Sequence, residues 1–190
     1  MQKIEKIQKV LSSFAQGYTL RDQKNLEDFM TLFSDKPELL VIGTNAVFPG
    51  DDEWCQGKEE VKTLIATDWE YWGDVKFDFD NASIQLLDNI AWIVTTGSLT
   101  DTISEKSTYE GFLSFANIMI NNEEDTRSDK KRTLEILALG NDLLSGLVLG
   151  EEYTWPLRFT AILALEEDRN WRFQQMQFSF ATTRTPDVRI

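Results

Sequence analysis

The sequence of 190 residues contains no histidine and a single cysteine, Cys55. Histidine is the commonest general base near neutral pH and the commonest ligand of transition metals, so its absence excludes Ser-His-Asp, Cys-His and His-zinc chemistry. A lone cysteine forms no intrachain disulfide, so nothing here favours an oxidising compartment. We therefore expect no metal and no cofactor, and composition alone identifies no catalytic residue.

Positive charge is also scarce, since 19 Lys and Arg accompany 32 Asp and Glu, for a formal net charge of −13. This charge opposes phosphate backbones and anionic lipid surfaces, so neither nucleic acid nor a membrane is an expected partner. The first ten residues mix charged with apolar side chains, and no apolar run approaches the length of a membrane span. The expected location is the cytoplasm.

Apolar and aromatic residues are plentiful, at 42% and 12% of the chain. This composition is typical of a folded globular protein. A chain of this length buries about two-thirds of its unfolded surface in one core. We expect a single domain over residues 1–190.

Three segments in the first half have helical spacing of apolar residues. The first begins near Ile4, the second is capped by Asn25 and stops before Pro37, and the third ends near Gly73. The predicted buried positions are Ile7, Leu11, Phe14 and Tyr18, then Leu26, Phe29, Met30 and Phe33, then Val61, Leu64, Ile65, Trp69 and Trp72.

Strand patterns occupy most of the remaining chain. The tight turn Asp88-Asn89 predicts an antiparallel hairpin, and a change in the phase of alternation predicts a bulge near Asn81 that bends the sheet. A loop is expected up to Gly57. The predicted strands are 39–42, 75–79, 90–100, 157–165 and 171–181.

Residues 103–153 interrupt the run of strands. The segment 112–120 favours a helix, with a strand over 108–120 as the alternative, and a charged linker then leads to a second helical pattern. Together these predict an inserted helical hairpin. Its leucines, Leu134, Leu137, Leu144 and Leu147, require burial, either as a lid over a cavity or in an oligomer interface.

Several stretches, taken in order, resemble the SnoaL-like branch of the nuclear-transport-factor-2-like, or ketosteroid-isomerase-like, superfamily. They are NLEDFMTLFSD in the second helix, WCQGKEEVKTLI entering the third, and LRFTAIL with NWRFQQMQFSF in the closing strands. The resemblance covers the chain apart from the insertion. It implies an α+β cone, in which a strongly bent antiparallel sheet wraps around the N-terminal helices and encloses an apolar cavity, and dimerisation through the outer face of the sheet.

The resemblance also suggests where a ligand would bind. It places even-numbered positions of the strand around Arg158 toward the cavity, where the guanidinium would anchor a carboxylate or phenolate; an ion pair with Glu151 or Glu152 is the alternative. The other predicted ligand-binding residues are Tyr18, Trp54, Trp92, Thr96, Thr160, Gln175 and Gln177. For Tyr18, the alternative is a core aromatic residue whose hydroxyl bonds to the backbone.

The cavity mouth in this family is bordered by a loop and helix that here carry Trp54, Trp69 and Trp72. Aromatic rims suit flat hydrophobic ligands, although core packing is the favoured explanation of these side chains. The acidic cluster 51–53 lies in the same loop and is typical of a solvated surface.

Catalysis is harder to predict than binding. Relatives carry histidine in the last strand where this chain has Gln175 and Gln177, and an amide cannot act as a general base. The stretch that would carry the base of a ketosteroid isomerase is VIGTNAVF here, without a carboxylate. The sequence favours a protein that binds a small apolar or aromatic molecule, which is anionic if Arg158 anchors it. The sequence leaves isomerase or cyclase activity open. The alternative is a non-catalytic dimerisation or partner-binding module.

Overall fold

The computed structural model describes residues 2–44, 46, 48–50, 53–102, 105–121, 128–149 and 152–180. Its contacts divide the chain into two compact units. The first takes in Met1–Leu99 and Trp155–Ala181, and the second includes Thr100–Thr154. Of the helices in the described ranges, none is both long enough and apolar enough to cross a lipid bilayer.

The first unit begins with the helix α1 (Gln2–Leu20), which has the predicted buried face. Its side chains Ile7, Leu11, Phe14 and Tyr18 are almost fully enclosed. A third helix, α3 (Lys58–Tyr71), buries Val61, Ile65 and Trp69. Both helices follow the spacing of their apolar residues, because side chains three and four positions apart lie on one helical face.

The second predicted helix is shorter and more irregular than expected. It consists of the 3₁₀ turn η1 (Gln23–Asn25), the four-residue helix α2 (Leu26–Phe29) and the 3₁₀ turn η2 (Met30–Leu32). Asn25 makes no capping hydrogen bond through its side chain, and Asp22 instead accepts one from the backbone N–H of Lys24. The apolar residues of this segment are nevertheless buried, as predicted.

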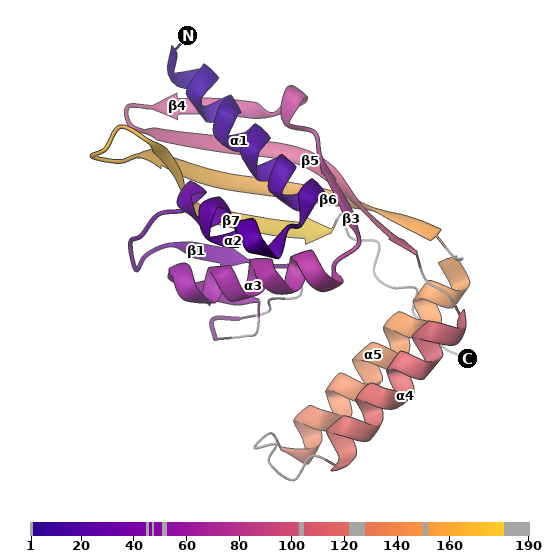
Figure 1. Ribbon diagram of the computed structural model, residues 1–190. Coiled ribbons are helices and arrows are strands. Elements are labelled where there is room, and N and C mark those ends of the chain that lie inside the picture. The colour runs from indigo at the N-terminus through magenta and orange to yellow at the C-terminus, as the bar shows by residue number, and fades with distance from the viewer. Residues whose placement is uncertain are drawn as a thin grey trace. The chain divides into compact units, whose positions relative to one another are not determined.

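Among the described residues, seven strands form one sheet in the order β2-β1-β7-β6-β5-β3, with β4 paired to β5 (Figure 1). Strand β1 runs parallel to β7, whereas the pairs β1–β2, β4–β5 and β6–β7 are antiparallel. The strands are β1 (Leu40–Ile42), β2 (Trp54–Gln56), β3 (Asp74–Phe77), β4 (Ser83–Leu87), β5 (Ile90–Thr102), β6 (Glu152–Leu165) and β7 (Trp171–Phe180).

Two local predictions for the sheet were incomplete. The expected loop before Gly57 contains the short strand β2, which pairs with β1. The expected bulge near Asn81 is a 3₁₀ turn, η3 (Phe79–Asn81), which separates β3 from β4. A register shift does occur, but between Ile162 and Leu163 in β6. The hairpin through Asp88-Asn89 is confirmed, since Leu87 pairs with Ile90.

The two faces of the sheet have different surroundings. Helices α1, α2 and α3 lie on one face, which we call the inner face, and the other face is the outer face (Figure 1). The inner face carries buried aromatic side chains, with Phe14 of α1 in contact with the rings of Phe77, Phe159 and Phe173. Ring packing of this kind adds directional contacts to the burial of apolar area.

One glycine makes part of this packing possible. A Cβ atom placed on Gly17 of α1 would lie 2.1 Å from the ring of Phe29, which is closer than real atoms approach. The absence of a side chain at Gly17 therefore lets α2 pack directly against α1.

The arrangement is the predicted α+β fold, a curved open sheet with the N-terminal helices on one face and a helical hairpin late in the chain (Figure 1). The hairpin belongs to the second unit and consists of α4 (Glu105–Asn121) and α5 (Asp129–Leu149), which pack against each other. A helix over 108–120 is thus confirmed and the strand alternative is wrong.

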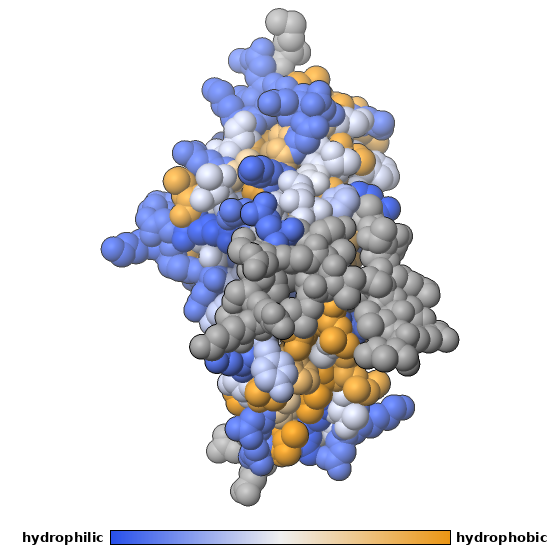
Figure 2. Space-filling view, turned by 90° about the vertical axis from the view of Figure 1, so that its right-hand side faces the viewer, coloured by the Kyte–Doolittle hydropathy of each residue, from blue (hydrophilic) through white to orange (hydrophobic). Residues whose placement is uncertain are grey.

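The hairpin exposes much of its apolar surface. Met119 and Leu143 are buried in the second unit, whereas Leu134 and Leu137 are 56% and 64% exposed. Figure 2 shows hydrophobic residues gathered on the surface of this helical pair, in the lower part of the view. Leu134, Leu137 and Leu144 are thus exposed within this unit, and their burial as a lid or in an oligomer interface stays a prediction. The side chain of Leu147 lies outside the described residues.

Candidate functional site

The predicted ligand-binding residues on the strands lie on the outer face. The buried residues of β6 are Leu157, Phe159, Ala161 and Leu163, and these odd-numbered side chains point toward the helices. Arg158 and Thr160 alternate with them, so the prediction that even-numbered side chains face an inner cavity is wrong. Aromatic and aliphatic side chains occupy the inner positions because they pack against Phe14 and its neighbours.

Four of the predicted residues still come together on that face. Arg158, Thr96, Thr160 and Gln177 line an open depression of about 550 Å³. The Arg158 guanidinium is exposed and donates a hydrogen bond of 2.6 Å to the carbonyl of Phe180. The expected ion pair with Glu152 is not seen among the described residues, and Glu151 lies outside them.

The remaining predicted residues lie in separate places. Trp92 is 58% exposed on the outer face beside Ser83 and Val94. Gln175 pairs with Ile162 and shares that face. Trp54, which is half-buried, lines a groove next to α3 rather than the outer face.

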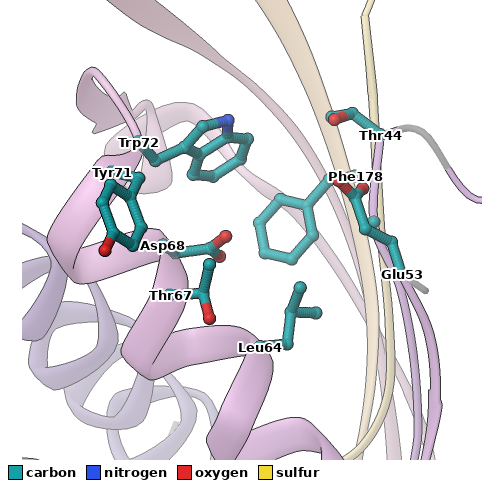
Figure 3. Close-up of a pocket in the computed structure, with 9 residues that line it drawn as sticks. Thr44, Glu53, Leu64, Thr67, Asp68, Tyr71, Trp72 and Phe178 are labelled. Atoms are coloured by element: carbon teal, nitrogen blue, oxygen red, sulfur yellow. The ribbon is translucent and has the colours of Figure 1, made fainter. Parts of the chain in front are cut away.

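A smaller pocket lies on the inner side, between α3 and the sheet. Its volume is about 170 Å³. Figure 3 shows Asp68 and Trp72 reaching into it from the helical side, opposite Glu53 and Phe178. The described lining residues are Gly43, Thr44, Glu53, Leu64, Thr67, Asp68, Tyr71, Trp72 and Phe178.

Asp68 is a polar residue of the pocket lining, and Tyr18 supports it from the core. The Tyr18 hydroxyl, which is buried, donates a hydrogen bond of 2.8 Å to Oδ2 of Asp68. Neither prediction for Tyr18 anticipated this partner, because a ligand or the backbone was expected. The two residues come from different helices, α1 and α3, so the hydrogen bond joins elements distant in sequence.

The environment makes Asp68 a carboxyl group that titrates near neutrality. The pKa of Asp68 is raised to about 7, chiefly by burial and also by the negative charge of Glu53. The hydrogen bond from Tyr18 and the positive charge of Arg21 lower the pKa and offset part of the burial. Burial likewise raises the pKa of Tyr18 well above its ordinary value of 10, so Tyr18 remains a proton donor at physiological pH.

Glu53 supplies a second carboxylate to the pocket, from the start of β2. Its position depends on Gly43, since a Cβ atom there would lie 2.2 Å from Oε2 of Glu53. The backbone N–H of Gly43 also donates to the carbonyl of Glu53 at 2.9 Å. The acidic loop was expected to be solvated surface, yet Glu53 lines the pocket; Asp51 and Asp52 lie outside the described residues.

Arg21 fixes the two helices that carry the Tyr18–Asp68 pair. Its Nε donates to the carbonyl of Tyr18 at 2.9 Å, and its two terminal nitrogens donate to the carbonyls of Trp72 and Gly73. The guanidinium thereby bridges the C-terminal ends of α1 and α3. The residue itself adopts a left-handed backbone conformation with φ of 48°, which terminates α1.

An open groove adjoins the inner pocket. The groove has a volume of about 570 Å³, and Glu53, Leu64, Thr67 and Asp68 line both spaces. Asp68 therefore lies at the boundary between the inner pocket and an open surface groove. Within the described part of the chain, no group of three or more Cys, Asp or Glu side chains is arranged to hold a metal ion.

Sequence reasoning overlooked Asp68, although the sequence contained a signal for it. Val61, Leu64, Ile65, Trp69 and Trp72 form the apolar stripe of α3. Asp68 occurs at a stripe position, four residues after Leu64 and three after Ile65. An acidic residue within an apolar stripe is costly to bury, and such a position is a candidate functional site.

Comparison with known proteins agrees with this architecture. A family model described as a SnoaL-like domain matches residues 10–125. The chain belongs to the SnoaL-like domain family. A comparison with curated proteins finds no significant match to this SnoaL-like chain.

Solved structures show the same fold in distant relatives. A nuclear transport factor 2-like protein from Salmonella enterica has 12% identity and a TM-score of 0.56, covering 96% of this SnoaL-like chain and 94% of its own. A ketosteroid isomerase-like protein from Erwinia carotovora has 10% identity and a TM-score of 0.55, with coverage of 94% and 95%. A protein from Streptomyces avermitilis, provisionally named a dehydratase, has 11% identity and a TM-score of 0.55, with coverage of 95% and 97%. At these identities the likeness shows the fold alone.

Proposed function

We propose that this SnoaL-like protein binds a small, uncharged and largely apolar molecule in the inner pocket, and that Asp68 transfers a proton on it as a general acid–base. The observation that carries the proposal is the partly buried Asp68 carboxyl, held by Tyr18, on the wall of a partly open pocket. This proposal differs from the sequence prediction in the residues involved and in the charge of the ligand.

A carboxyl group with a pKa of about 7 takes the place that histidine fills in other enzymes. General acid–base catalysis is most effective when the pKa lies near the working pH, because both protonation states are then populated. The hydrogen bond from Tyr18 fixes Oδ2 of Asp68. It leaves Oδ1 as the oxygen that can take a proton from a bound molecule.

The size and lining of the pocket define the substrate class. A dry cavity of about 150 Å³ accommodates benzene, so a pocket of about 170 Å³ is suited to a compound of roughly one six-membered ring. Leu64, Trp72 and Phe178 supply apolar walls. Asp68 and Glu53 would repel an anion, so we expect a neutral ketone or hydroxyketone.

The chemistry needs no additional reactant. The ionised Asp68 removes a proton from the carbon next to the carbonyl group, and the electron pair of the C–H bond moves to form the enolate. In a β,γ-unsaturated ketone the enolate is a dienolate, and return of the same proton to the γ-carbon gives the isomeric α,β-unsaturated ketone. Alternatively, loss of a β-hydroxyl group with this proton gives water and an unsaturated ketone. The structural likeness to proteins named ketosteroid isomerase-like and dehydratase supports this reaction class.

Proton exchange provides a direct test without knowledge of the natural substrate. Cyclohexanone and 2-cyclohexen-1-one are incubated with the protein in D₂O, and loss of the exchangeable C–H signals is followed by ¹H NMR between pH 5.5 and 8.5. The wild-type protein is expected to accelerate exchange with an inflection near pH 7. Asp68→Asn is expected to accelerate exchange at least about 100-fold less than the wild-type protein, because a general base usually contributes a factor of this size.

The matched control is Asp80→Asn, which makes the same chemical change at an exposed position of η3. This variant is expected to exchange protons at the wild-type rate. Equal rates for the wild-type protein and Asp68→Asn with both ketones across the pH range would refute the proposed role of Asp68.

A second candidate function, assembly into a homodimer, is favoured by the outer face. Leu87, Ile90, Trp92 and Val94 are exposed by 74%, 43%, 58% and 47% and lie together on the β4–β5 hairpin. Isolated apolar residues are common on surfaces, but a contiguous apolar strip is typical of an interface. We propose that a second copy covers this strip, with Arg158 and Thr160 nearby in the same interface.

Sedimentation equilibrium tests this assembly. The wild-type protein is expected to have twice the mass of the chain at micromolar concentration, and Trp92→Lys to shift toward the monomer. Leu20→Lys, which adds the same charge at an exposed apolar residue of α1 away from the outer face, is the control for the change in charge alone. A monomeric wild-type protein at 100 µM, or equal dissociation of the two variants, would contradict the proposed interface.

The boundaries of the domain form a further part of the proposal. We propose that residues 103–153 are an insertion into a single SnoaL-like domain in the cytoplasm. Replacing this segment by a short Gly-Ser linker is expected to leave a folded protein with a cooperative melting transition. Loss of cooperative unfolding in the shortened chain would indicate that the helical hairpin is an integral part of the core.

A further inference from the structure

A basic groove lies on the first unit, away from the inner pocket. It has a volume of about 480 Å³ and is formed by α1, by η2 and by the turn between β6 and β7. The described lining residues of the two sites do not overlap. The groove is lined by Lys6, Lys9, Val10, Thr31, Leu32, Arg169, Asn170, Trp171 and Arg172.

The concentration of positive charge in this groove is unusual for the chain. Lys and Arg account for 19 of 190 residues, and the net charge is −13. The groove nevertheless brings together Lys6, Lys9, Arg169 and Arg172, and its described lining contains no carboxylate. A local basic site in an acidic protein is suited to an anion, because a cleft concentrates the field of the charges that line it.

Neighbouring carboxylates neutralise only one of these cations. Arg172 forms ion pairs with Glu166 at 2.7 Å and with Asp168 at 2.6 Å. Within the described part of the chain, the side chains of Lys6, Lys9 and Arg169 make no ion pair or hydrogen bond. Three positive charges therefore remain available to a ligand.

The turn that carries Arg169 is well fixed. Backbone hydrogen bonds join Arg169 to Glu166 at 3.0 Å and Glu166 to Asn170 at 2.9 Å. Arg172 contacts the turn through Asp168 and also donates to the carbonyl of Thr31 in η2 at 3.3 Å. This network joins the β6–β7 turn to η2 on one side of the groove, and Lys6 and Lys9 extend from α1 on the other side.

Trp171 forms part of the groove wall. The residue is 3% exposed and lines the groove, and its indole Nε1 has no hydrogen-bond partner among the described residues. Indole N–H is only a donor, and a buried donor without an acceptor costs about 1–3 kcal/mol. Because Nε1 is itself buried, its signal reports on the packing of the groove wall rather than on direct contact with a ligand.

We propose that this groove binds the phosphate group of a small organic phosphate, whose carbon skeleton lies against Val10 and Leu32. A phosphate dianion uses several cations at once, and the fork of an arginine such as Arg169 matches its oxygens. The volume exceeds the needs of inorganic phosphate, which leaves room for an organic part. The overall negative charge disfavours a nucleic acid chain as the source of the phosphate.

Phenyl phosphate is the probe, and the indole N–H signal of Trp171 is the readout. The six tryptophan indole signals are followed in ¹H–¹⁵N spectra during titration, and Trp171→Phe assigns the relevant signal. The Trp171 signal is expected to shift in a saturable manner. The double variant Lys6→Gln with Lys9→Gln is expected to weaken binding at least about tenfold, because it removes two charge-assisted contacts.

The double variant Lys24→Gln with Lys76→Gln is the matched control. Both lysines are exposed and lie outside the groove, so net charge changes equally and affinity is expected to remain within about twofold of the wild type. An equal loss of affinity in both double variants would show nonspecific attraction and overturn the proposal. The absence of a saturable shift at 20 mM phenyl phosphate, or equal affinity for benzoate, would also overturn it.

Discussion

Asp68→Asn provides a quantitative test of the environment described for the inner pocket. An unfolded chain ionises aspartate with a pKa of about 3.9, whereas burial raises the pKa of Asp68 in the folded protein to about 7. At a pH between these two pKa values, the Asp68 carboxyl is protonated in the folded protein and ionised in the unfolded chain. The free energy of unfolding therefore falls as pH rises, until Asp68 is fully ionised above pH 7.

The size of the effect follows from the two pKa values. The contribution of Asp68 to the free energy of unfolding is expected to decrease by about 2 kcal/mol between pH 5.5 and pH 8.5. Asparagine does not titrate, so the stability of Asp68→Asn relative to the wild type should rise by the same amount over this range. Working above pH 5 keeps the protein away from its isoelectric point of about 4.4.

The assay is urea unfolding followed by tryptophan fluorescence at several pH values, with Asp80→Asn as the control for removal of one exposed charge. Trp69 follows Asp68 in the sequence of α3 and is buried, so its fluorescence reports on the unfolding of the first unit. The comparison is valid when the free energy of unfolding decreases with urea concentration at the same slope in each protein. A stability difference between Asp68→Asn and the wild type that stays constant from pH 5.5 to pH 8.5 would refute the raised pKa.

Two further variants test the neighbours of Asp68. Tyr18→Phe removes the hydrogen bond that lowers the pKa of Asp68, so the carboxyl ¹³C signal should titrate at higher pH and stability should fall by about 1–2 kcal/mol; an unchanged titration would contradict this. Gly43→Ala places a methyl group against Glu53, so Glu53 must move, which should lower the pKa of Asp68 and cost about 1–3 kcal/mol in urea unfolding. Gly50→Ala, at a position with open space but a positive φ, separates backbone strain from this steric effect, and an equal pKa change in both variants would count against it.

The helices were predictable because their signal is local. The spacing of Ile7, Leu11, Phe14 and Tyr18 specifies one helical face, and those side chains are the buried ones. The irregular segment around α2 was less predictable. There, Asp22 rather than Asn25 accepts the capping hydrogen bond, and the choice between two adjacent capping residues depends on how the chain leaves α1.

The orientation of the sheet was predicted wrongly for a physical reason. Alternation in β6 correctly grouped Arg158 with Thr160, but two faces exist and alternation alone does not identify which one the helices cover. The family resemblance assigned the even-numbered residues to a cavity. In this chain the odd-numbered Phe159 and Leu163 have greater apolar area, and their burial against α1 decides the orientation.

The inner pocket was the least predictable feature. Its polar pair joins Tyr18 to Asp68 across 50 positions of sequence, and Glu53 approaches only because Gly43 has no side chain. Such contacts depend on the packing of α1, α3 and the sheet rather than on any local pattern. Sequence identifies the residues that are able to titrate, but burial determines which of them does so near neutrality.

The bridge made by Arg21 has a consequence for how this pocket changes over evolution. Arg21 joins α1 to α3 through backbone carbonyls, which every amino acid possesses, and not through the side chains of Tyr18 or Asp68. Scaffold geometry and reactive groups are thereby specified by separate residues. The side chain at position 68 can therefore be exchanged while the backbone bridge of Arg21 still joins the ends of α1 and α3, so the polarity of the pocket can change without loss of the fold.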